Sequence, residues 1–295
     1  MSVTTVEQAR MIAHRMMQAN RVMRGHPCFD EDAHERVGRV HLPVAPRCNI
    51  GCLFCERRVC ANLTMQHPGW ARRLLSPAEA LDLVRDLVQA HPGERFVVGV
   101  AGPGEPLAND DTFEALRLVK ERFPHLTACL STNGFLLEKK LPDLLDVGIQ
   151  TLTVTVNAPD GEVGQSIYGW VSCDREVLRG RAAAELLVAR QMGGIRAALD
   201  AGLAVKVNTV LVPGVNDVHL ARLARRLQAL GVHLMNIMPL IPGGQMADRR
   251  PPTCEEVQQA REACGELVRQ FHKCEQCRAD VIRFPGEGGT EGWTV

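Results

Sequence analysis

The chain has 295 residues, and its 34 lysine and arginine side chains balance 34 aspartates and glutamates, so its formal net charge is zero. A chain of this length can bury one large core, but its neutral balance offers no electrostatic footprint for a nucleic-acid backbone. No apolar run reaches the roughly 18 residues of a membrane span, and no basic-then-apolar leader starts the chain, so we expect a cytoplasmic protein with neither a membrane nor a nucleic-acid partner.

The first part of the chain combines a predicted helix, a predicted strand and a cysteine-rich loop. Residues 4–24 are rich in alanine, methionine, arginine and glutamine and look helical, and residues 40–45 form an apolar run typical of a strand. Directly afterwards, Cys48, Cys52 and Cys55 have the spacing C-x3-C-x2-C. Three thiolates on a short loop suit a [4Fe–4S] cluster. Because no fourth cysteine follows at cluster spacing, one iron could bind a ligand that is not protein.

The following elements alternate between strand and helix. Strands are predicted at residues 96–100, 126–130, 152–156, 205–211 and 232–238. Helices are predicted at residues 76–90, 110–122, 139–147, 175–201, 218–230 and 253–272. The fourth of these helices has a doubtful break at Gly193-Gly194, and the last opens with a capping box of Thr253 and Glu256.

Repeated strand–helix units predict a parallel sheet with right-handed crossovers. Six units are too few to close an eight-stranded barrel, so the expected fold class is α/β, a partial, open (βα)6 barrel that binds its ligands at the C-terminal ends of the strands. We expect the barrel to occupy residues 40–242. Residues 1–39 would form an N-terminal extension with a cluster ligand, and residues 243–295 a C-terminal helix and cluster-binding tail.

The cysteine loop resembles the signature of the radical S-adenosylmethionine (SAM) superfamily. Its spacing after a strand matches in full, and Phe54 stands just before the last cysteine, as in that pattern. The resemblance implies that the open iron binds the amino and carboxylate groups of SAM.

Polar residues and glycines follow the predicted strands at the end of the barrel where SAM would bind. In the stretch 101–106, glycines let backbone approach a ligand, and Glu105 with exposed carbonyls could accept hydrogen bonds from an ammonium group. Amide and hydroxyl groups at later strand ends suit a carboxylate, a ribose and an adenine. The candidate cofactor-binding residues are Gly102, Gly104, Glu105, Pro106, Ser131, Asn133, Asn157, Asn208 and Met238. Each position alone is more often turn chemistry, so their recurrence is the signal.

Eight cysteines lie outside the loop, and in a reduced compartment we do not expect them to form disulfides. Cys274 and Cys277 form a C-x2-C pair, the commonest metal-ligand spacing, and need partners from elsewhere in the fold. Cys60 and Cys129 are both expected to face the barrel mouth. The further candidate metal ligands are Cys28, His41, Cys60, Cys129, Cys274 and Cys277. The cysteines expected to be small buried hydrophobes are Cys173, Cys254 and Cys264.

Taken together, several motifs resemble a narrower family, NifB, the nitrogenase cofactor-maturation enzymes. The resemblance runs over about residues 26–282 and is carried by residues 26–28, 48–62, 101–109, 129–134, 153–158, 167–170, 236–240 and 274–280. It implies that the catalytic, SAM-cleaving cluster lies on Cys48, Cys52 and Cys55. It also implies two sites for [4Fe–4S] substrate clusters, one on Cys28, His41 and Cys129 and the other on Cys274, Cys277 and Cys60.

The resemblance further implies a reaction and a set of partners. Two substrate clusters are fused into a precursor called NifB-co. One SAM donates a methyl group to a cluster sulfide, and a second gives the 5′-deoxyadenosyl radical that abstracts hydrogen from that methyl, whose carbon becomes the central carbide. Such an enzyme depends on an iron–sulfur cluster donor, a ferredoxin-type electron donor and a downstream nitrogenase cofactor scaffold or carrier.

Two stretches depart from the family's pattern. The family usually follows Cys-Ala-Asn with Glu-Ser-Arg-Pro, whereas this chain has Leu-Thr-Met-Gln-His-Pro at residues 63–68. The missing acid and arginine would lie near the place where the substrate clusters meet. Glu105 replaces the family's more frequent aspartate, a change of one methylene that keeps an acceptor.

On the residues alone, three alternatives stay open. Another radical SAM enzyme with an auxiliary cluster, related to molybdenum-cofactor cyclases or tRNA-modifying enzymes, would also use the pair Cys274 and Cys277. A non-catalytic iron–sulfur scaffold would need no glycine-rich SAM site. A structural zinc protein would need four closed ligands, usually as two C-x2-C pairs.

Overall fold

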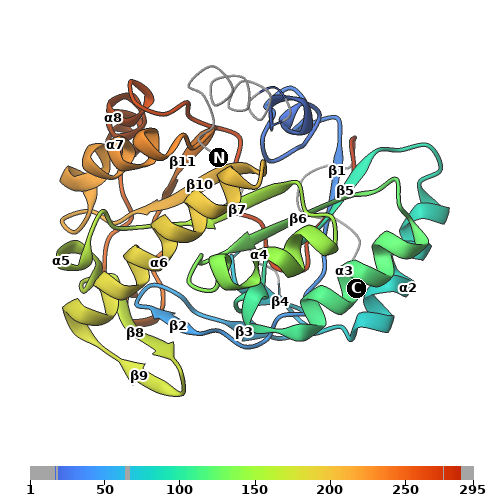
Figure 1. Ribbon diagram of the computed structural model, residues 1–295, viewed down its shortest axis with the longest axis horizontal. Coiled ribbons are helices and arrows are strands. Elements are labelled where there is room, and N and C mark those ends of the chain that lie inside the picture. The colour runs from blue at the N-terminus through green and yellow to red at the C-terminus, as the bar shows by residue number, and fades with distance from the viewer. Residues whose placement is uncertain (1–16, 18, 64–66, 275, 287–295) are drawn as a thin grey trace, which may run out of the picture.

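The computed structural model describes residues 17, 19–63, 67–274 and 276–286, and in this part of the chain the main sheet has seven strands. The sheet curls into an open half-barrel (Figure 1). In spatial order its strands are β11 (Leu234–Pro239), β10 (Ala204–Leu211), β7 (Thr151–Thr155), β6 (Thr127–Thr132), β5 (Phe96–Val100), β1 (Gly38–His41) and β12 (Ile282–Arg283). The first six are parallel and β12 pairs antiparallel with β1. The predicted α/β partial (βα)6 barrel is therefore confirmed.

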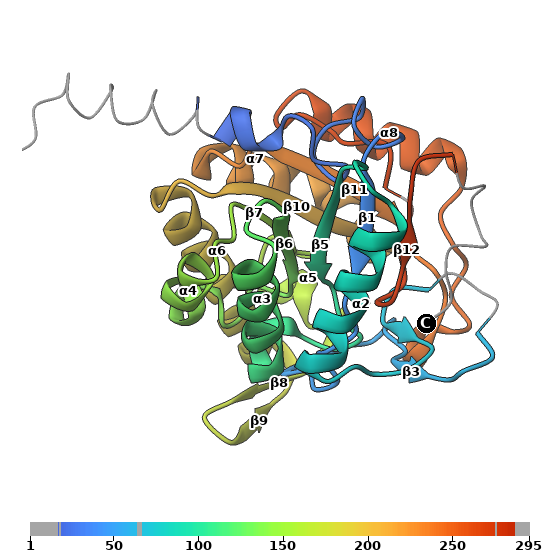
Figure 2. The ribbon, with the colours of Figure 1, turned by 90° about the vertical axis from the view of Figure 1, so that its right-hand side faces the viewer.

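Helices cover the outer face of the sheet. They are α2 (Pro77–Ala90), α3 (Asp110–Arg122), α4 (Leu137–Asp146), α6 (Gly180–Asp200), α7 (Leu220–Leu230) and α8 (Cys254–Gly265). Figure 2 shows α2, α3, α4 and α6 on one side of the curled sheet. None of the helices in the described ranges is both long and apolar enough to cross a membrane.

The two faces of the sheet differ in polarity, and this difference positions the site. Along β7, Leu152 and Val154 are fully buried in the main hydrophobic core. Because side chains alternate along a strand, Thr151, Thr153 and Thr155 lie on the opposite face, which is the inside of the half-barrel. An interior lined by hydroxyl groups can hold polar or inorganic ligands that an aliphatic barrel core would exclude.

Several predicted bounds are wrong in detail. The first strand ends at His41 instead of reaching residue 45, since Pro43 has no N–H for the ladder. Of the predicted helix 4–24, residues 17 and 19–23 are helical, and most of the remainder lies outside the described residues. The helix predicted at 253–272 ends at Gly265, because the chain then pairs with β11: the Met235 N–H donates to the Arg269 carbonyl at 2.9 Å.

The predicted helix 175–201 is the largest correction. Its first residues instead belong to a hairpin of β8 (Tyr168–Cys173) and β9 (Glu176–Leu178), which projects from the body of the molecule (Figure 1). Arg175 lies in the hairpin turn with a φ of 71°. The doubtful break at Gly193-Gly194 does not occur, because α6 is continuous there. A Cβ on Gly194 would lie 2.7 Å from Cβ of Leu137, so the glycine allows α6 and α4 to pack closely.

Smaller elements complete the described part of the chain. They are β2 (Ile50–Cys52), which pairs with β8; the two-stranded pair β3 (Arg58–Val59) and β4 (Trp70–Ala71); the short helix α5 (Gly161–Gly164); and the 3-10 helices at Pro106–Ala108, Asp217–His219 and Gly244–Met246.

The C-terminal segment crosses the open side of the half-barrel. It pairs with β11 through Arg269 and Phe271, and then with β1 through β12, which Figure 2 shows beside that strand. Between these two points the Ala279 N–H donates to the Trp70 carbonyl at 2.9 Å. The segment that carries Cys274 and Cys277 is thus held at both edges of the sheet.

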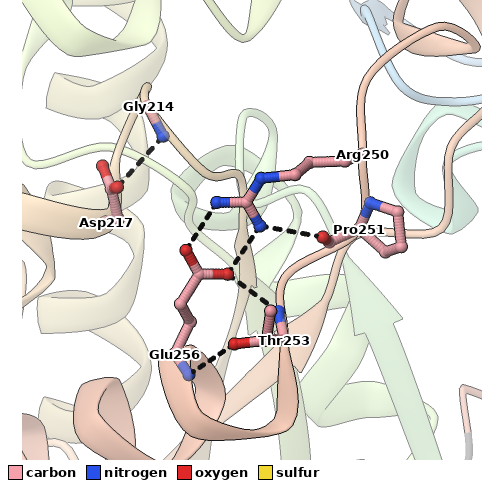
Figure 3. A network of polar contacts seen from close by, with 6 residues as sticks. All are labelled: Gly214, Asp217, Arg250, Pro251, Thr253 and Glu256. Carbon is pink, nitrogen blue, oxygen red and sulfur yellow. Dashed lines mark hydrogen bonds and ion pairs between the residues drawn. The ribbon is translucent and has the colours of Figure 1, made fainter.

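A polar network fixes the start of α8, which leads into this segment. The predicted capping box is confirmed: the Glu256 N–H donates to the Thr253 hydroxyl at 3.2 Å, and the Thr253 N–H donates to the Glu256 carboxylate at 2.8 Å (Figure 3). Arg250 donates to both oxygens of that carboxylate. This pairing lowers the pKa of Glu256 to about 2, so the network stays ionised at neutral pH.

Candidate functional site

The three-cysteine loop lies at the mouth of the half-barrel and is braced on two sides. On one side the Leu53 N–H donates to the Ile167 carbonyl at 2.8 Å, and on the other the Gln245 N–H donates to the Leu53 carbonyl at 2.7 Å. A Cβ on Gly51 would overlap the indole of Trp170, so only glycine allows this contact between β2 and β8. The first strand of the β8–β9 hairpin, which precedes the predicted helix 175–201, therefore holds the cysteine loop in place.

One pocket contains most of the predicted site. The predicted residues that line it are Cys48, Cys52, Cys55, Gly104, Glu105, Ser131, Asn133, Asn157 and Met238. The predicted residues that do not line it are Gly102, Pro106 and Asn208.

The glycine-rich stretch after β5 packs on the backbone that leads into the cysteine loop. The Gly104 N–H donates to the Ala45 carbonyl at 2.6 Å, and the Glu105 N–H donates to the Arg47 carbonyl at 2.8 Å. A Cβ on Gly104 would overlap the Arg47 carbonyl. Here the glycine allows one backbone segment to approach another closely, and this contact joins the two loops that form one wall of the pocket.

Glu105 is held in place by hydrogen bonds within the protein. It is 2% exposed, and its Oε1 accepts hydrogen bonds from the Thr132 hydroxyl at 2.5 Å and from the Leu107 N–H at 3.0 Å. Its Oε2 accepts from the Asn133 N–H at 2.7 Å. Burial raises the pKa of Glu105 to about 7, against the opposing effect of these donors. The carboxyl group thus joins the β5 loop to the end of β6.

The two asparagines in the pocket differ in what they leave free. The Asn133 side chain is used within the protein, since its Nδ2 donates to Asn49 Oδ1 at 2.7 Å and its Oδ1 accepts from the Phe135 N–H at 2.9 Å. The Asn157 Oδ1 accepts from the Val210 N–H at 2.9 Å, but its buried Nδ2 has no hydrogen-bond partner among the described residues. A buried donor without a partner is costly, and a ligand in the pocket would satisfy it.

Some pocket residues were missed by the sequence analysis. Tyr168, the only tyrosine of the chain, accepts a hydrogen bond from the Asn157 N–H at 3.0 Å. His67 stacks on Trp70 with ring centroids 4.8 Å apart, and its buried Nε2 has no partner in the described part of the chain. Tyr168 stood in a segment that carried the family resemblance. His67 belongs to the departing stretch 63–68, of which residues 64–66 lie outside the described residues.

The three thiols of the loop fit a metal cluster by their chemistry. Burial raises the pKa of Cys48 to about 11 and the pKa of Cys52 well above its ordinary value, and it also raises the pKa of Cys55. Thiols in this environment become thiolates only when a positive centre binds them. Within the described ranges no three histidine, cysteine or acidic side chains converge on a point that would hold a single metal ion. A cubane cluster is larger than an ion and has one iron for each ligand, so its cysteines need not converge on one point.

Deeper in the half-barrel, the structure brings Cys28, His41 and Cys129 together from three distant segments. Both Cys129 Sγ and His41 Cδ2 lie close to Gly99, where a Cβ would be 2.7 Å and 3.5 Å from these atoms. Cys129 is the third residue of β6 and not its end, so it lies below the mouth that it was predicted to face. Cys28 is near enough to act electrostatically on Cys129.

His41 is prepared to act as a neutral ligand. Burial lowers its pKa to about 4, so the imidazole is uncharged at neutral pH. Its Nδ1 lies 3.0 Å from the Arg278 carbonyl, which accepts the Nδ1–H. This bond fixes the tautomer in which Nε2 keeps its lone pair, the usual arrangement for a metal-binding histidine.

The second predicted substrate-cluster set is less closely gathered. Cys274 lies at the C-terminal end of β11, with its Sγ 3.9 Å from the sulfur of Met238. Cys277 is half-buried on the same crossing segment, whereas Cys60 is exposed. Cys60 and Ala279 donate their N–H groups to Ala71 and Trp70, so the chains bearing Cys60 and Cys277 flank the same short strand, β4.

The three cysteines that were predicted to be small buried hydrophobes differ in how deeply they are buried. Cys264 is fully buried in the main core, as predicted. Cys254 is exposed at the first turn of α8, and Cys173 is half-exposed beside the hairpin turn. The prediction was wrong for Cys254, whose side chain faces solvent in the first turn of α8, whereas Cys173 is partly buried and packs against the main core.

Comparison with known proteins decides the family. The model of the radical SAM superfamily matches residues 42–227. The FeMo cofactor biosynthesis protein NifB of Methanocaldococcus jannaschii is 44% identical over 272 residues, which cover 92% of this chain and 90% of that protein. The chain belongs to the NifB family. The NifB of Klebsiella pneumoniae is 43% identical over 91% of this chain and 58% of its own length.

Solved structures support the fold of this NifB-family chain. The crystal structure of Streptococcus suis SuiB bound to S-adenosylmethionine has a TM-score of 0.57 and 11% identity, and the match covers 82% of this chain and 52% of that one. At this identity the likeness concerns the fold alone, which is the half-barrel described above.

Proposed function

We propose that this chain is a radical SAM enzyme of nitrogenase cofactor biosynthesis, which fuses two [4Fe–4S] clusters and inserts a SAM-derived carbide to make the NifB-co precursor. The observation that carries the proposal is a single pocket lined by the three loop cysteines, with a polar barrel interior below it that holds Cys28, His41 and Cys129. Its NifB relatives are described as FeMo cofactor biosynthesis proteins.

The cluster on Cys48, Cys52 and Cys55 would supply the electron that cleaves SAM. Around it, the chain's own residues orient SAM: the Asn157 Nδ2 offers the unpartnered donor, Ser131 offers a hydroxyl group, and the apolar edge of the pocket includes Met238. The Glu105 brace keeps the walls formed by the β5 loop and the end of β6 in register. A fixed wall limits the positions that a reactive fragment of SAM can reach.

The substrate clusters would be held by incomplete ligand sets. Cys28, Cys129 and the lone pair of His41 Nε2 would hold one cluster inside the barrel, and Cys274, Cys277 and Cys60 the other on its open side. A cluster that has to be released needs weaker attachment than a resident one, and a neutral imidazole exchanges without leaving an uncompensated buried charge. The expected partners are a cluster donor, a ferredoxin-type electron donor and a downstream cofactor scaffold or carrier.

The SAM-cleaving role is tested by changing Cys48, Cys52 and Cys55 together to alanine. Release of 5′-deoxyadenosine from SAM by the reduced, reconstituted protein should fall to background, because SAM loses the iron that binds it. Cys254→Ala, at an exposed cysteine outside the pocket, is the matched control and should retain the activity. Persistence of SAM cleavage in the triple variant would show that the cluster is elsewhere.

A further inference from the structure

A buried lysine lies inside the half-barrel, where none of the predicted ligands supplies a positive charge. Lys206 on β10 is 2% exposed. In the sheet it is in register with Thr153, so its side chain lies on the same inner face as Thr153 and Thr155, the latter at the floor of the pocket.

The contacts of the Lys206 ammonium group are polar or aromatic, but not anionic. Its Nζ donates to the Cys28 carbonyl at 2.7 Å and lies over the rings of Phe29 and Phe271, 5.3 Å and 4.7 Å from their centroids. Among the residues that the structure describes, no carboxylate lies within the 4.0 Å of an ion pair with it. A buried cation without an anion is strongly unfavourable, so its presence indicates an anionic partner.

The groups close to Lys206 identify that partner. Cys129 on β6 is in register with Thr151 on β7, two residues before Thr153, so Cys129 and Lys206 lie on the same inner face of the sheet. The Lys206 Nζ also donates a hydrogen bond to the backbone carbonyl of Cys28. The Lys206 ammonium group therefore lies against the backbone of Cys28 and on the same inner face as Cys129, two of the residues that the proposed function assigns to the cluster inside the barrel.

We infer that Lys206 is the counter-charge and positioning residue for the iron–sulfur substrate cluster inside the barrel, where it balances the negative charge of the Cys28 and Cys129 thiolates and of the reduced cluster. The inference rests on the proposed function. The negative charge arises when both thiols lose their protons on binding iron, and one-electron reduction adds to it. Net charge is one of the factors that set both cluster retention and reduction potential.

The test compares Lys206→Met with Lys206→Arg, and uses Lys139→Met, at an exposed lysine, as the control for net charge. Iron per chain and the midpoint potentials of the EPR signals are measured on anaerobically reconstituted protein. Lys206→Met should either lose about four irons, one cubane, or keep them with a more negative midpoint potential for one cluster. Lys206→Arg and Lys139→Met should match the wild type, and the signal perturbed by SAM should be unchanged in all variants.

The cluster-free proteins separate a charge role from a purely structural one. Methionine fits among aromatic rings and removes an unpaired buried charge, so the thermal unfolding midpoint of cluster-free Lys206→Met should not fall. The inference would be contradicted if cluster-free Lys206→Met unfolded at a lower temperature than the wild type and Lys206→Arg lost as much iron as Lys206→Met. Those two results would show that the lysine only supports the fold. If Lys206→Met and the wild type bind the same amount of iron and have the same midpoint potentials, the inference is contradicted but the proposed function is not. A wild-type chain that binds only about four irons would contradict the proposed function and, with it, the inference.

Discussion

At the scale of single residues, hydrogen bonds between neighbouring strands and loops fix the side chains that meet in the pocket, as those from the Thr132 hydroxyl and the Asn133 N–H to Glu105 illustrate. The loop cysteines, Glu105 and Asn157 were all predicted site residues, and all line one pocket. The brace between Glu105 and Thr132 could not be predicted, because it joins residues 27 positions apart through the register of two strands. The role of Tyr168 likewise depends on a hairpin that local pattern did not reveal.

The burial of Glu105 predicts a pH-dependent stability. The pKa of this carboxyl is 4.5 in its ordinary state and about 7 in the folded chain. The folded state therefore binds the Glu105 proton more tightly than the unfolded state does. The resulting contribution to the free energy of unfolding is present in full below pH 4.5 and is lost as the pH rises to about 7. The loss amounts to at most about 3 kcal/mol.

Glu105→Gln removes this titration. Its amide places a donor near the Asn133 N–H, so the variant should be less stable at every pH, but its deficit relative to wild type should shrink as the pH rises from 4.5 to 7. Urea unfolding of the two cluster-free proteins across this range measures the difference. A deficit that stays constant would mean that Glu105 is ionised in the folded chain throughout.

At the scale of elements, buried strands and capped helices were readily predicted, and the least regular segments were not. The run Phe96–Val100 is buried along its whole length, as its continuous apolar sequence indicates. The segment 168–178 was missed because a short run of mixed residues fits a helix as well as a strand, and only pairing with β2 decides between them. Gly193-Gly194 suggested a break, whereas the structure uses Gly194 to bring α6 close to α4.

The two adjacent glycines of α6 should respond oppositely to alanine. A Cβ at position 194 meets Leu137 at 2.7 Å, so Gly194→Ala should destabilise the chain by about 1–3 kcal/mol through overpacking. At position 193 the nearest atom is the end of the flexible Glu138 side chain at 3.3 Å, so Gly193→Ala should stabilise by up to about 1 kcal/mol through helix propensity. Thermal unfolding of both variants tests this. If Gly193→Ala and Gly194→Ala lost similar stability, close packing of α6 against α4 would not be the reason for the glycine at position 194.

At the scale of the whole molecule, the sequence was sufficient to predict a six-unit open barrel, but not the segment that crosses its open side. The repeated alternation of strand and helix determines the sheet. The path from Gly265 to β12 depends on pairing with two edge strands far away in sequence, β11 and β1. This path places Cys274 and Cys277 on the open side of the barrel, whereas Cys28, His41 and Cys129 lie on other segments, and the proposed function needs both sets.

The iron content of anaerobically reconstituted protein, measured together with EPR spectra in the presence and absence of SAM, tests the three-cluster account most directly. Three cubanes predict about twelve irons per chain and one cluster signal that SAM perturbs. About eight irons would mean a SAM-cleaving cluster with a single auxiliary cluster, and such a chain could not hold the two substrate clusters whose fusion is proposed.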